Sequence, residues 1–102
     1  MRRAARIDAP QPDIVRALRR CGYVVHITST AGEGYPDLTV GCPWGEIVLI
    51  EIKDGDKPPS AQKLTPDQVE FHQRWHRFPV LTVISVRDCF EQLERRRKER
   101  ER

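Results

Sequence analysis

The segment Glu46–Lys53 is a nearly unbroken apolar run, Glu-Ile-Val-Leu-Ile-Glu-Ile-Lys, that ends with an acid and a base two residues apart. A run of this length, rich in Ile and Val and bounded by turn residues, is typical of a strand buried on both faces. Side chains alternate along a strand, so Glu51 and Lys53 point to the same side. Charged groups at the end of a buried strand are costly unless they are paired or used. We therefore expect the chain to be organised around this pair.

The length of the chain suits one small hydrophobic core. Its 102 residues predict a single domain over residues 1–102, with a core at about 8–93 and a basic helical tail at 94–102. No apolar run approaches the roughly 20 residues needed to span a membrane, and the basic N-terminus lacks the apolar segment of a signal peptide. Three widely spaced cysteines without a Cys-x-x-Cys pair argue against a disulfide framework and a zinc ribbon. We expect an intracellular protein.

Charge is distributed unevenly along the sequence. The formal net charge is +3, but residues 95–102 alone carry six basic and two acidic residues, a net of +4 that leaves −1 for the remainder. The first twenty residues are also basic, with six arginines against Asp8 and Asp13. Basic ends around an acidic middle suit a protein that binds phosphates and holds a cation. For the tail, solvated helix surface is the equal alternative.

Hydrophobic periodicity and turn residues predict the order helix, three strands, helix, strand, helix. The start of the second helix is well marked, because Thr65 is a good N-cap, Pro66 suits the first helical position, and Gln68 stands where a capping box takes Glu or Gln. The expected helices lie at 11–21, 66 to about 78, and from 88 onward; the expected strands lie at 23–28, 37–40, 46–53 and 80–86.

The second and third strands are joined by a tight turn, so we expect an antiparallel hairpin. In such a hairpin Asp37, at the start of one strand, lies beside Glu51, at the end of the other. Two converging carboxylates suit a hard divalent cation such as Mg²⁺, which takes oxygen ligands, and the backbone carbonyl of Ile52 is a further candidate ligand. Lys53 would then position or activate a water, or stabilise charge on a phosphate, as in metal-assisted phosphodiester hydrolysis. A salt-bridged Asp–Lys–Glu cluster is the alternative that spacing leaves open.

The order of the motifs resembles a known nuclease superfamily. Pro36-Asp37 followed by Glu51-Ile52-Lys53 is similar to the PD-(D/E)XK signature. Three further runs resemble its small VRR-NUC branch: Gly-x-Gly-x-Pro-Asp-Leu at 32–38, Glu-x-Lys-Asp-Gly at 51–55, and Pro-Ser-x-x-Lys-Leu-Thr-Pro-Asp-Gln at 59–68. The likeness covers roughly residues 8–86. It implies a restriction endonuclease-like α/β fold of order α-β-β-β-α-β with a mixed central sheet, to which this chain adds a C-terminal helix.

The resemblance also implies roles for individual residues. Asp37 and Glu51 would bind the metal, with Mg²⁺ as cofactor and Mn²⁺ as its substitute, and Lys53 would be catalytic. Gln68 is implied as a site residue too, because related nucleases place a glutamine on the helix after Glu-x-Lys. Its capping position offers a purely local role, and it can serve both. Many nucleases of the superfamily carry a Glu on the first helix, which is absent here, so the number of metal ions stays open.

Other polar and aromatic residues give weaker signals. His72 and His76 are four apart on a helix, as zinc ligands can be, but no third ligand is evident. Trp75 is expected in the core, whereas Trp44 at a turn tip is left open, and either could stack on a base. A polar loop beside the expected site offers three contacts to phosphate, with a solvated loop as the equal alternative: Lys57, Ser60 and Lys63.

Together these features predict a Mg²⁺-dependent endodeoxyribonuclease. One metal centre per chain would require a homodimer or higher homo-oligomer to cut two strands or a junction. The resemblance suggests phage or bacterial origin, the cytoplasm of a bacterial host, and structured or branched DNA as substrate. One rival is a non-catalytic nucleic-acid-binding module with a degenerate site, which would bind DNA without metal. Another is a structural protein whose charged C-terminal helix docks on a partner chain.

Overall fold

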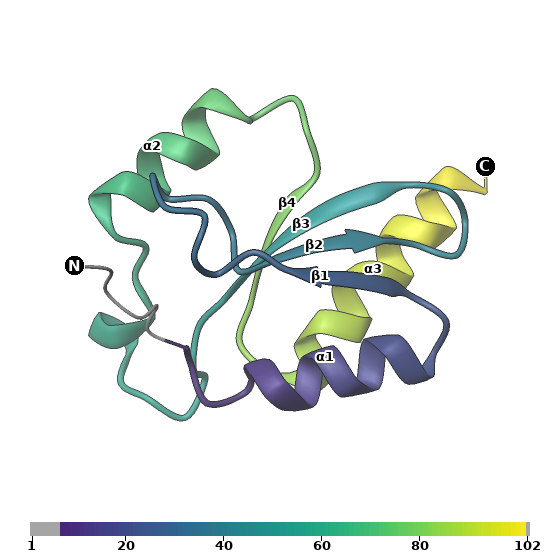
Figure 1. Cartoon of the computed structure of the whole chain (residues 1–102), viewed down its shortest axis with the longest axis horizontal. Coiled ribbons are helices and arrows are strands. Elements are labelled where there is room, and N and C mark those ends of the chain that lie inside the picture. Colours follow the sequence, from purple (N-terminus) through teal and green to yellow (C-terminus); the bar gives the residue numbers. More distant parts are fainter. Residues whose placement is uncertain (1–6, 102) are drawn as a thin grey trace.

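The fold was taken from a computed structural model, which describes residues 7–101; residues 1–6, with part of the basic N-terminus considered above, and residue 102 lie outside the described part. The chain has the predicted order of elements (Figure 1). In sequence they are α1 (Gln11–Arg20), β1 (Val24–Ile27), β2 (Leu38–Gly41), β3 (Ile47–Ile52), a short 3₁₀ helix η1 (Pro59–Gln62), α2 (Pro66–Arg74), β4 (Val80–Val83) and α3 (Val86–Arg100).

The four strands form one mixed sheet in the order β1-β2-β3-β4. The first three strands pair antiparallel, as their short connections require, and β4 pairs parallel with β3. A parallel pair needs a crossover connection, and the segment containing α2 supplies it. The predicted mixed central sheet is therefore confirmed.

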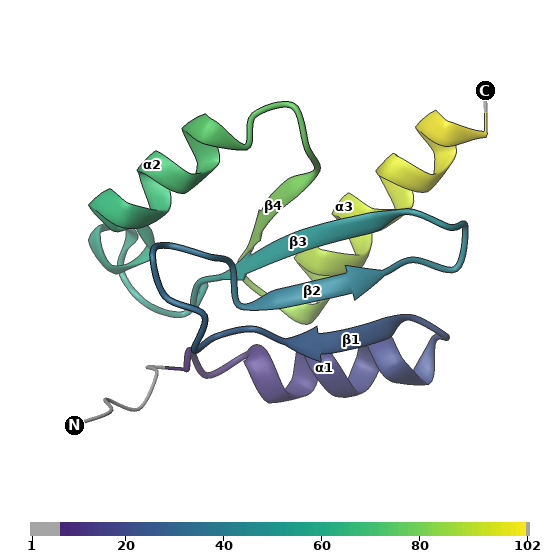
Figure 2. The same cartoon turned by 45° about the horizontal axis from the view of Figure 1, so that its top comes forward.

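The hydrophobic core lies between the sheet and the helices α1 and α3, whereas α2 stands on the other side, at the end of the sheet where β3 finishes (Figure 2). The strand β3 is exposed only at Ile47 and buried from Val48 to Ile52, as its apolar run predicted. The central side chains of the core are fully buried: Ile14, Leu18, Val40, Val48, Ile50, Val83, Cys89 and Leu93.

Three element boundaries differ from the sequence expectations by two residues or more, and one of them is the end of β4, which lies at Val83 rather than Val86. The helix α2 ends at Arg74 rather than near Phe78, which leaves Trp75 37% exposed, so the expectation that Trp75 belongs to the core is wrong. The helix α3 begins at Val86, two residues early, because Ser85 is an unrecognised N-cap whose hydroxyl accepts a hydrogen bond from the backbone of Asp88. Within residues 7–101, every helix is too short or too polar to cross a membrane.

Part of the basic tail is bound to the β2–β3 turn. Arg96 donates to both carboxylate oxygens of Glu46, at 2.7 and 2.5 Å, and Arg100 donates at 3.3 Å. Burial opposes ionisation of Glu46, but the hydrogen bonds from Arg96 and Trp44 outweigh it and lower the pKa of this carboxyl. Trp44 also packs edge-on against Tyr23, with ring centroids 5.9 Å apart. The tail is therefore not uniformly solvated surface, because two of its arginines hold the hairpin against α3.

Candidate functional site

The register of the β2–β3 hairpin brings the two predicted carboxylates together. Leu38 pairs with Ile50, so Asp37, one residue earlier on its strand, stands beside Glu51, one residue later on the other. The backbone N–H of Ile52 donates to Asp37 Oδ2 at 2.7 Å. This bond fixes the Asp37 side chain across the end of the hairpin. The antiparallel hairpin and its juxtaposition of acids agree with the prediction from spacing.

The side chains of Glu51 and Lys53 are buried, with 2% and 7% of their surface exposed. They are bridged by one residue of α2: Gln68 donates to Glu51 Oε2 at 3.0 Å and accepts from Lys53 Nζ at 2.9 Å. The other carboxylate oxygen of Glu51, Oε1, is buried and has no hydrogen-bond partner among residues 7–101. A buried carboxylate oxygen without a partner is costly in a stable fold. This oxygen is therefore available to a ligand.

Gln68 also closes the capping box at the start of α2. The backbone N–H of Thr65 donates to Gln68 Oε1 at 2.8 Å, and the backbone N–H of Gln68 donates to Thr65 Oγ1 at 3.3 Å. The same amide oxygen thus accepts from Thr65 and from Lys53. The two roles weighed for Gln68 from the sequence coexist in one side chain.

Electrostatics at the carboxylate pair favour a bound cation. Burial and the adjacent Asp37 carboxylate raise the pKa of Glu51 to about 9. Burial also raises the pKa of Asp37, although the hydrogen bond from Ile52 opposes it. Neighbouring carboxyls in a desolvated site hold a proton between them unless a cation replaces it. The pair therefore fits a divalent metal, which favours oxygen ligands.

The described residues offer this cation two side-chain ligands. Across residues 7–101 no group of three or more His, Cys, Asp or Glu side chains is arranged to hold a metal. That count agrees with Mg²⁺, which is commonly bound through one or two carboxylates and keeps several waters. It does not support a zinc site at His72 and His76. The ring of His76 forms a hydrogen bond with the backbone carbonyl of Gln73, and the buried Nε2 of His72 has no hydrogen-bond partner in the described part of the chain.

The loop between β1 and β2 presses against the start of α2. Gly32, Glu33 and Gly34 all have positive φ, at 81°, 55° and 76°. A Cβ atom on Gly34 would lie 2.2 Å from the carbonyl oxygen of Asp67 and 2.9 Å from the backbone nitrogen of Gln68. Only glycine permits this approach. The loop therefore supports the turn of helix that carries Gln68.

The three predicted phosphate contacts lie on the connection between β3 and α2. Lys57, Ser60 and Lys63 are exposed, and within residues 7–101 their side chains make no hydrogen bond or ion pair. None of the three side chains is bonded to a residue of the carboxylate site. Their role as contacts to phosphate stays a prediction.

The two roles of Gln68 can be separated by substitution. Gln68→Met keeps the length of the side chain but removes both the amide nitrogen that donates to Glu51 and the amide oxygen that accepts from Lys53. We expect the affinity for Mn²⁺, measured by titration calorimetry, to fall roughly 10- to 100-fold. Thr65→Ala is the matched control: it should cost about 1 kcal/mol of unfolding free energy through the lost cap and leave the affinity for Mn²⁺ unchanged. Equal Mn²⁺ affinity for the two variants would contradict the bridging role.

Comparison with known proteins gives one informative match. No family model matches the sequence, and no curated protein matches it. A solved structure described as a VRR_NUC domain is similar in fold, with a TM-score of 0.64 and 28% sequence identity; the match covers 82% of this chain and 89% of the other. The resemblance to VRR-NUC domains and the restriction endonuclease-like fold, both predicted from the motifs, are therefore confirmed.

Proposed function

We propose that this chain, a nuclease-type protein of VRR-NUC fold, is a metal-dependent endonuclease that hydrolyses phosphodiester bonds in DNA. The observation that carries the proposal is the carboxylate pair of the half-buried Asp37 and the buried Glu51, with an oxygen on Glu51 that has no partner among residues 7–101 and an ammonium group held beside it by Gln68. The similarity to a VRR_NUC domain structure supports the nuclease class. Nuclease chemistry explains why a fold of this size keeps a buried acid and a buried lysine beside a second, half-buried acid.

In this proposal each residue has a distinct role. Asp37, Glu51 and the backbone carbonyl of Ile52 hold Mg²⁺ or Mn²⁺. The bound cation supplies charge neutralisation at the phosphate and lowers the pKa of a coordinated water. Lys53 places a positive charge beside the carboxylates, where it orients a water or stabilises the negative charge that develops on the phosphate oxygens. Gln68 holds Glu51 through Oε2, which leaves Oε1 for the ligand.

The proposal also covers the domain, the oligomeric state and the setting of the enzyme. The enzyme is a single domain over residues 1–102, with its core at about 8–93 and a basic helical tail at 94–102. One site per chain requires a homodimer or higher homo-oligomer for cuts in both strands, as structured or branched DNA demands. The exposed side chains on the connection after β3 contact the DNA backbone: Lys57, Ser60 and Lys63. The proposed setting is the cytoplasm of a bacterial host, and the protein is proposed to be of phage or bacterial origin.

The test is cleavage of supercoiled plasmid and of a labelled four-way junction in Mg²⁺, Mn²⁺ or EDTA. We expect cutting only with metal, and a loss of roughly 100-fold or more in Lys53→Met, which keeps the length and apolar stem of the side chain but removes its charge. Lys98→Met, an exposed change on α3, is the control and should cut like the wild type. Thermal unfolding of both variants shows whether the fold is kept.

The competing function is a nucleic-acid-binding module without catalysis. Wild-type protein that cuts neither substrate with either metal, yet binds DNA equally well in EDTA, would overturn the nuclease proposal and establish that module. Cleavage that survives Lys53→Met at full rate would remove the role assigned to the lysine.

A further inference from the structure

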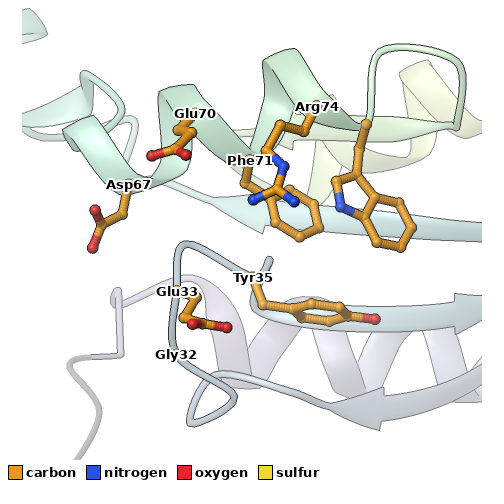
Figure 3. Close-up of a pocket in the computed structure, with 8 residues that line it drawn as sticks. Gly32, Glu33, Tyr35, Asp67, Glu70, Phe71 and Arg74 are labelled. Atoms are coloured by element: carbon orange, nitrogen blue, oxygen red, sulfur yellow. The ribbon is translucent and has the colours of Figure 1, made fainter.

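A pocket of about 450 Å³ lies between α2 and the loop that precedes β2, beside the carboxylate site but separate from it (Figure 3). Its volume is within the roughly 300–1,000 Å³ of pockets that hold small ligands. Aromatic and charged side chains line it from both sides, and none of them belongs to the carboxylate pair or its lysine. No sequence pattern predicts this pocket, although Trp75 was considered above as a residue that could stack on a base.

Aromatic rings line the pocket on both sides, Phe71 and Trp75 from the side of α2 and Tyr35 from the loop. Phe71 and Trp75 are stacked, with ring centroids 5.0 Å apart and planes 11° apart, and Tyr35 meets Phe71 edge-on at 5.3 Å. Phe71 is buried, but Trp75 is 37% exposed. The row of rings therefore begins on the buried Phe71, continues through the partly exposed indole that lines the pocket, and ends at Phe78, whose ring centroid lies 5.2 Å from that of Trp75. A fixed aromatic surface of this kind stacks on another flat ring at little entropic cost.

The charges in the pocket select against phosphate. Three carboxylates, from Glu33, Asp67 and Glu70, face one guanidinium, that of Arg74, for a net charge of −2. Arg74 extends from α2 toward the loop that carries Glu33 and Tyr35 (Figure 3). It already places a cation in the pocket, so an external ammonium or guanidinium group gains less there. A neutral planar ligand that carries both hydrogen-bond donors and acceptors fits these three carboxylates and one guanidinium best.

A nucleobase has these properties. Carboxylates accept hydrogen bonds from the exocyclic amines of adenine, cytosine and guanine, and arginine donates to base nitrogen and oxygen acceptors. Thymine has no exocyclic amine, so its carbonyl oxygens would face the carboxylates unfavourably. A base can reach such a pocket only when it is unpaired and unstacked.

The pocket lies within reach of a phosphate at the carboxylate site. Gln68 touches Glu51 and belongs to the same helical stretch as the stacked rings. Trp75 is seven residues further along, which corresponds to about 10 Å of helix rise. Successive phosphates of one strand are spaced by ~3.4 Å along the axis of a stacked duplex and lie further apart where the bases are unstacked. A base at Trp75 therefore belongs to a nucleotide within about three positions of the one being cut.

We propose that this pocket binds an unpaired amine-bearing base of the DNA substrate, beside the scissile phosphate. The inference rests on the proposed function, since it assumes a nucleic acid at the carboxylate site. It names the feature that the enzyme reads in its substrate: a nucleotide that is free to leave the base stack, as at a flap, bulge or junction.

The test uses flap DNA with 2-aminopurine in the unpaired arm, in EDTA, because stacking on an indole quenches this fluorescent base. We expect quenching on wild-type binding, and a loss of roughly 5- to 100-fold in affinity for the arm with Trp75→Leu. Phe78→Leu is the matched control, since Phe78 contacts Trp75 but does not line the pocket. Glu70→Gln, an exposed substitution that keeps the helix, should reduce the preference for 2-aminopurine over thymine.

Parallel measurements of DNA binding and of metal-dependent cleavage separate the two proposals. Cleavage with no quenching, or with quenching that Trp75→Leu and Glu70→Gln both leave unchanged, overturns the pocket and leaves the nuclease standing. Quenching that depends on Trp75, in a protein that never cuts, supports the pocket and overturns the nuclease. A third outcome is that an arginine-rich peptide binds tightly and that the fluorescence of 2-aminopurine in the DNA is not quenched. This outcome assigns the pocket to a cationic ligand and overturns the inference.

Discussion

Glu51→Gln should abolish metal-dependent cleavage and at the same time stabilise the metal-free protein at alkaline pH. The substitution keeps the size of the side chain and an oxygen that accepts from Gln68, but it removes a charge from a buried position beside Asp37. Burial and Asp37 raise the pKa of Glu51 to about 9 from an ordinary value of 4.5. The folded state therefore holds a proton that the unfolded state releases. Between these two values the unfolding free energy of the wild type falls as pH rises.

The measurement is urea unfolding at pH 5, 7 and 8.5 in EDTA, followed by the same series with Mg²⁺. The stability advantage of Glu51→Gln should be small at pH 5 and grow toward pH 8.5. Mg²⁺ should raise the unfolding midpoint of the wild type, because it binds the folded state, and leave that of the variant unchanged. Glu99→Gln, an exposed change on α3, should have little effect at any pH. A variant that tracks the wild type across this range, or that Mg²⁺ still stabilises, contradicts the assignment.

Gly34→Ala is expected to be the most destabilising single-methyl change in the loop before β2. The residue has a φ of 76°, and its new Cβ would meet the backbone of Asp67 and Gln68 at 2.2–2.9 Å. The left-handed backbone and the enforced displacement of α2 together should cost roughly 2–5 kcal/mol. Because the start of α2 carries Gln68, the affinity for Mn²⁺ should fall in the fraction that stays folded.

Gly32→Ala isolates the contribution of close approach. Gly32 has a similar φ of 81°, but no atom of the described residues lies within 4 Å of its added Cβ. It should therefore cost only about 1–2 kcal/mol and leave Mn²⁺ binding intact. Chemical denaturation of the two variants gives the comparison. Equal losses at the two positions would show that backbone strain alone, and not contact with α2, sets the requirement for glycine.

The residues that could be placed from sequence are those whose neighbours are close along the chain or fixed by one register. A short antiparallel hairpin has few possible registers, and so the meeting of Asp37 with Glu51 follows from strand pattern alone. The capping box at Thr65 and Gln68 is a signal four residues long. The contact of Gln68 with Glu51 depends on how α2 packs against the sheet, which no local pattern predicts. Only the family resemblance suggested that Gln68 belongs to the site.

What escaped prediction depends on contacts between distant segments. The pairing of Glu46 with Arg96 joins residues fifty positions apart, and nothing in either local pattern marks the partner. The exposure of Trp75 follows from α2 ending at Arg74, before the proline at 79 that marks the expected boundary. The pocket beside it exists only because the loop at Gly34 lies against α2. Helical periodicity predicts which face of a helix points inward, but it does not predict which residues that face packs against.

The helix that completes the site is lightly attached. Of the nine residues of α2, only Phe71 is buried, whereas α1, α3 and the sheet share the main core. Segments with little buried surface open first in hydrogen exchange, well below the energy of global unfolding. Such an opening carries Gln68 away from Glu51 and Lys53 while the β1–β2–β3 meander stays paired. The fraction of molecules that can act at any moment is then the fraction in which α2 is closed. A base bound against Trp75 would increase that fraction, because it binds the closed state.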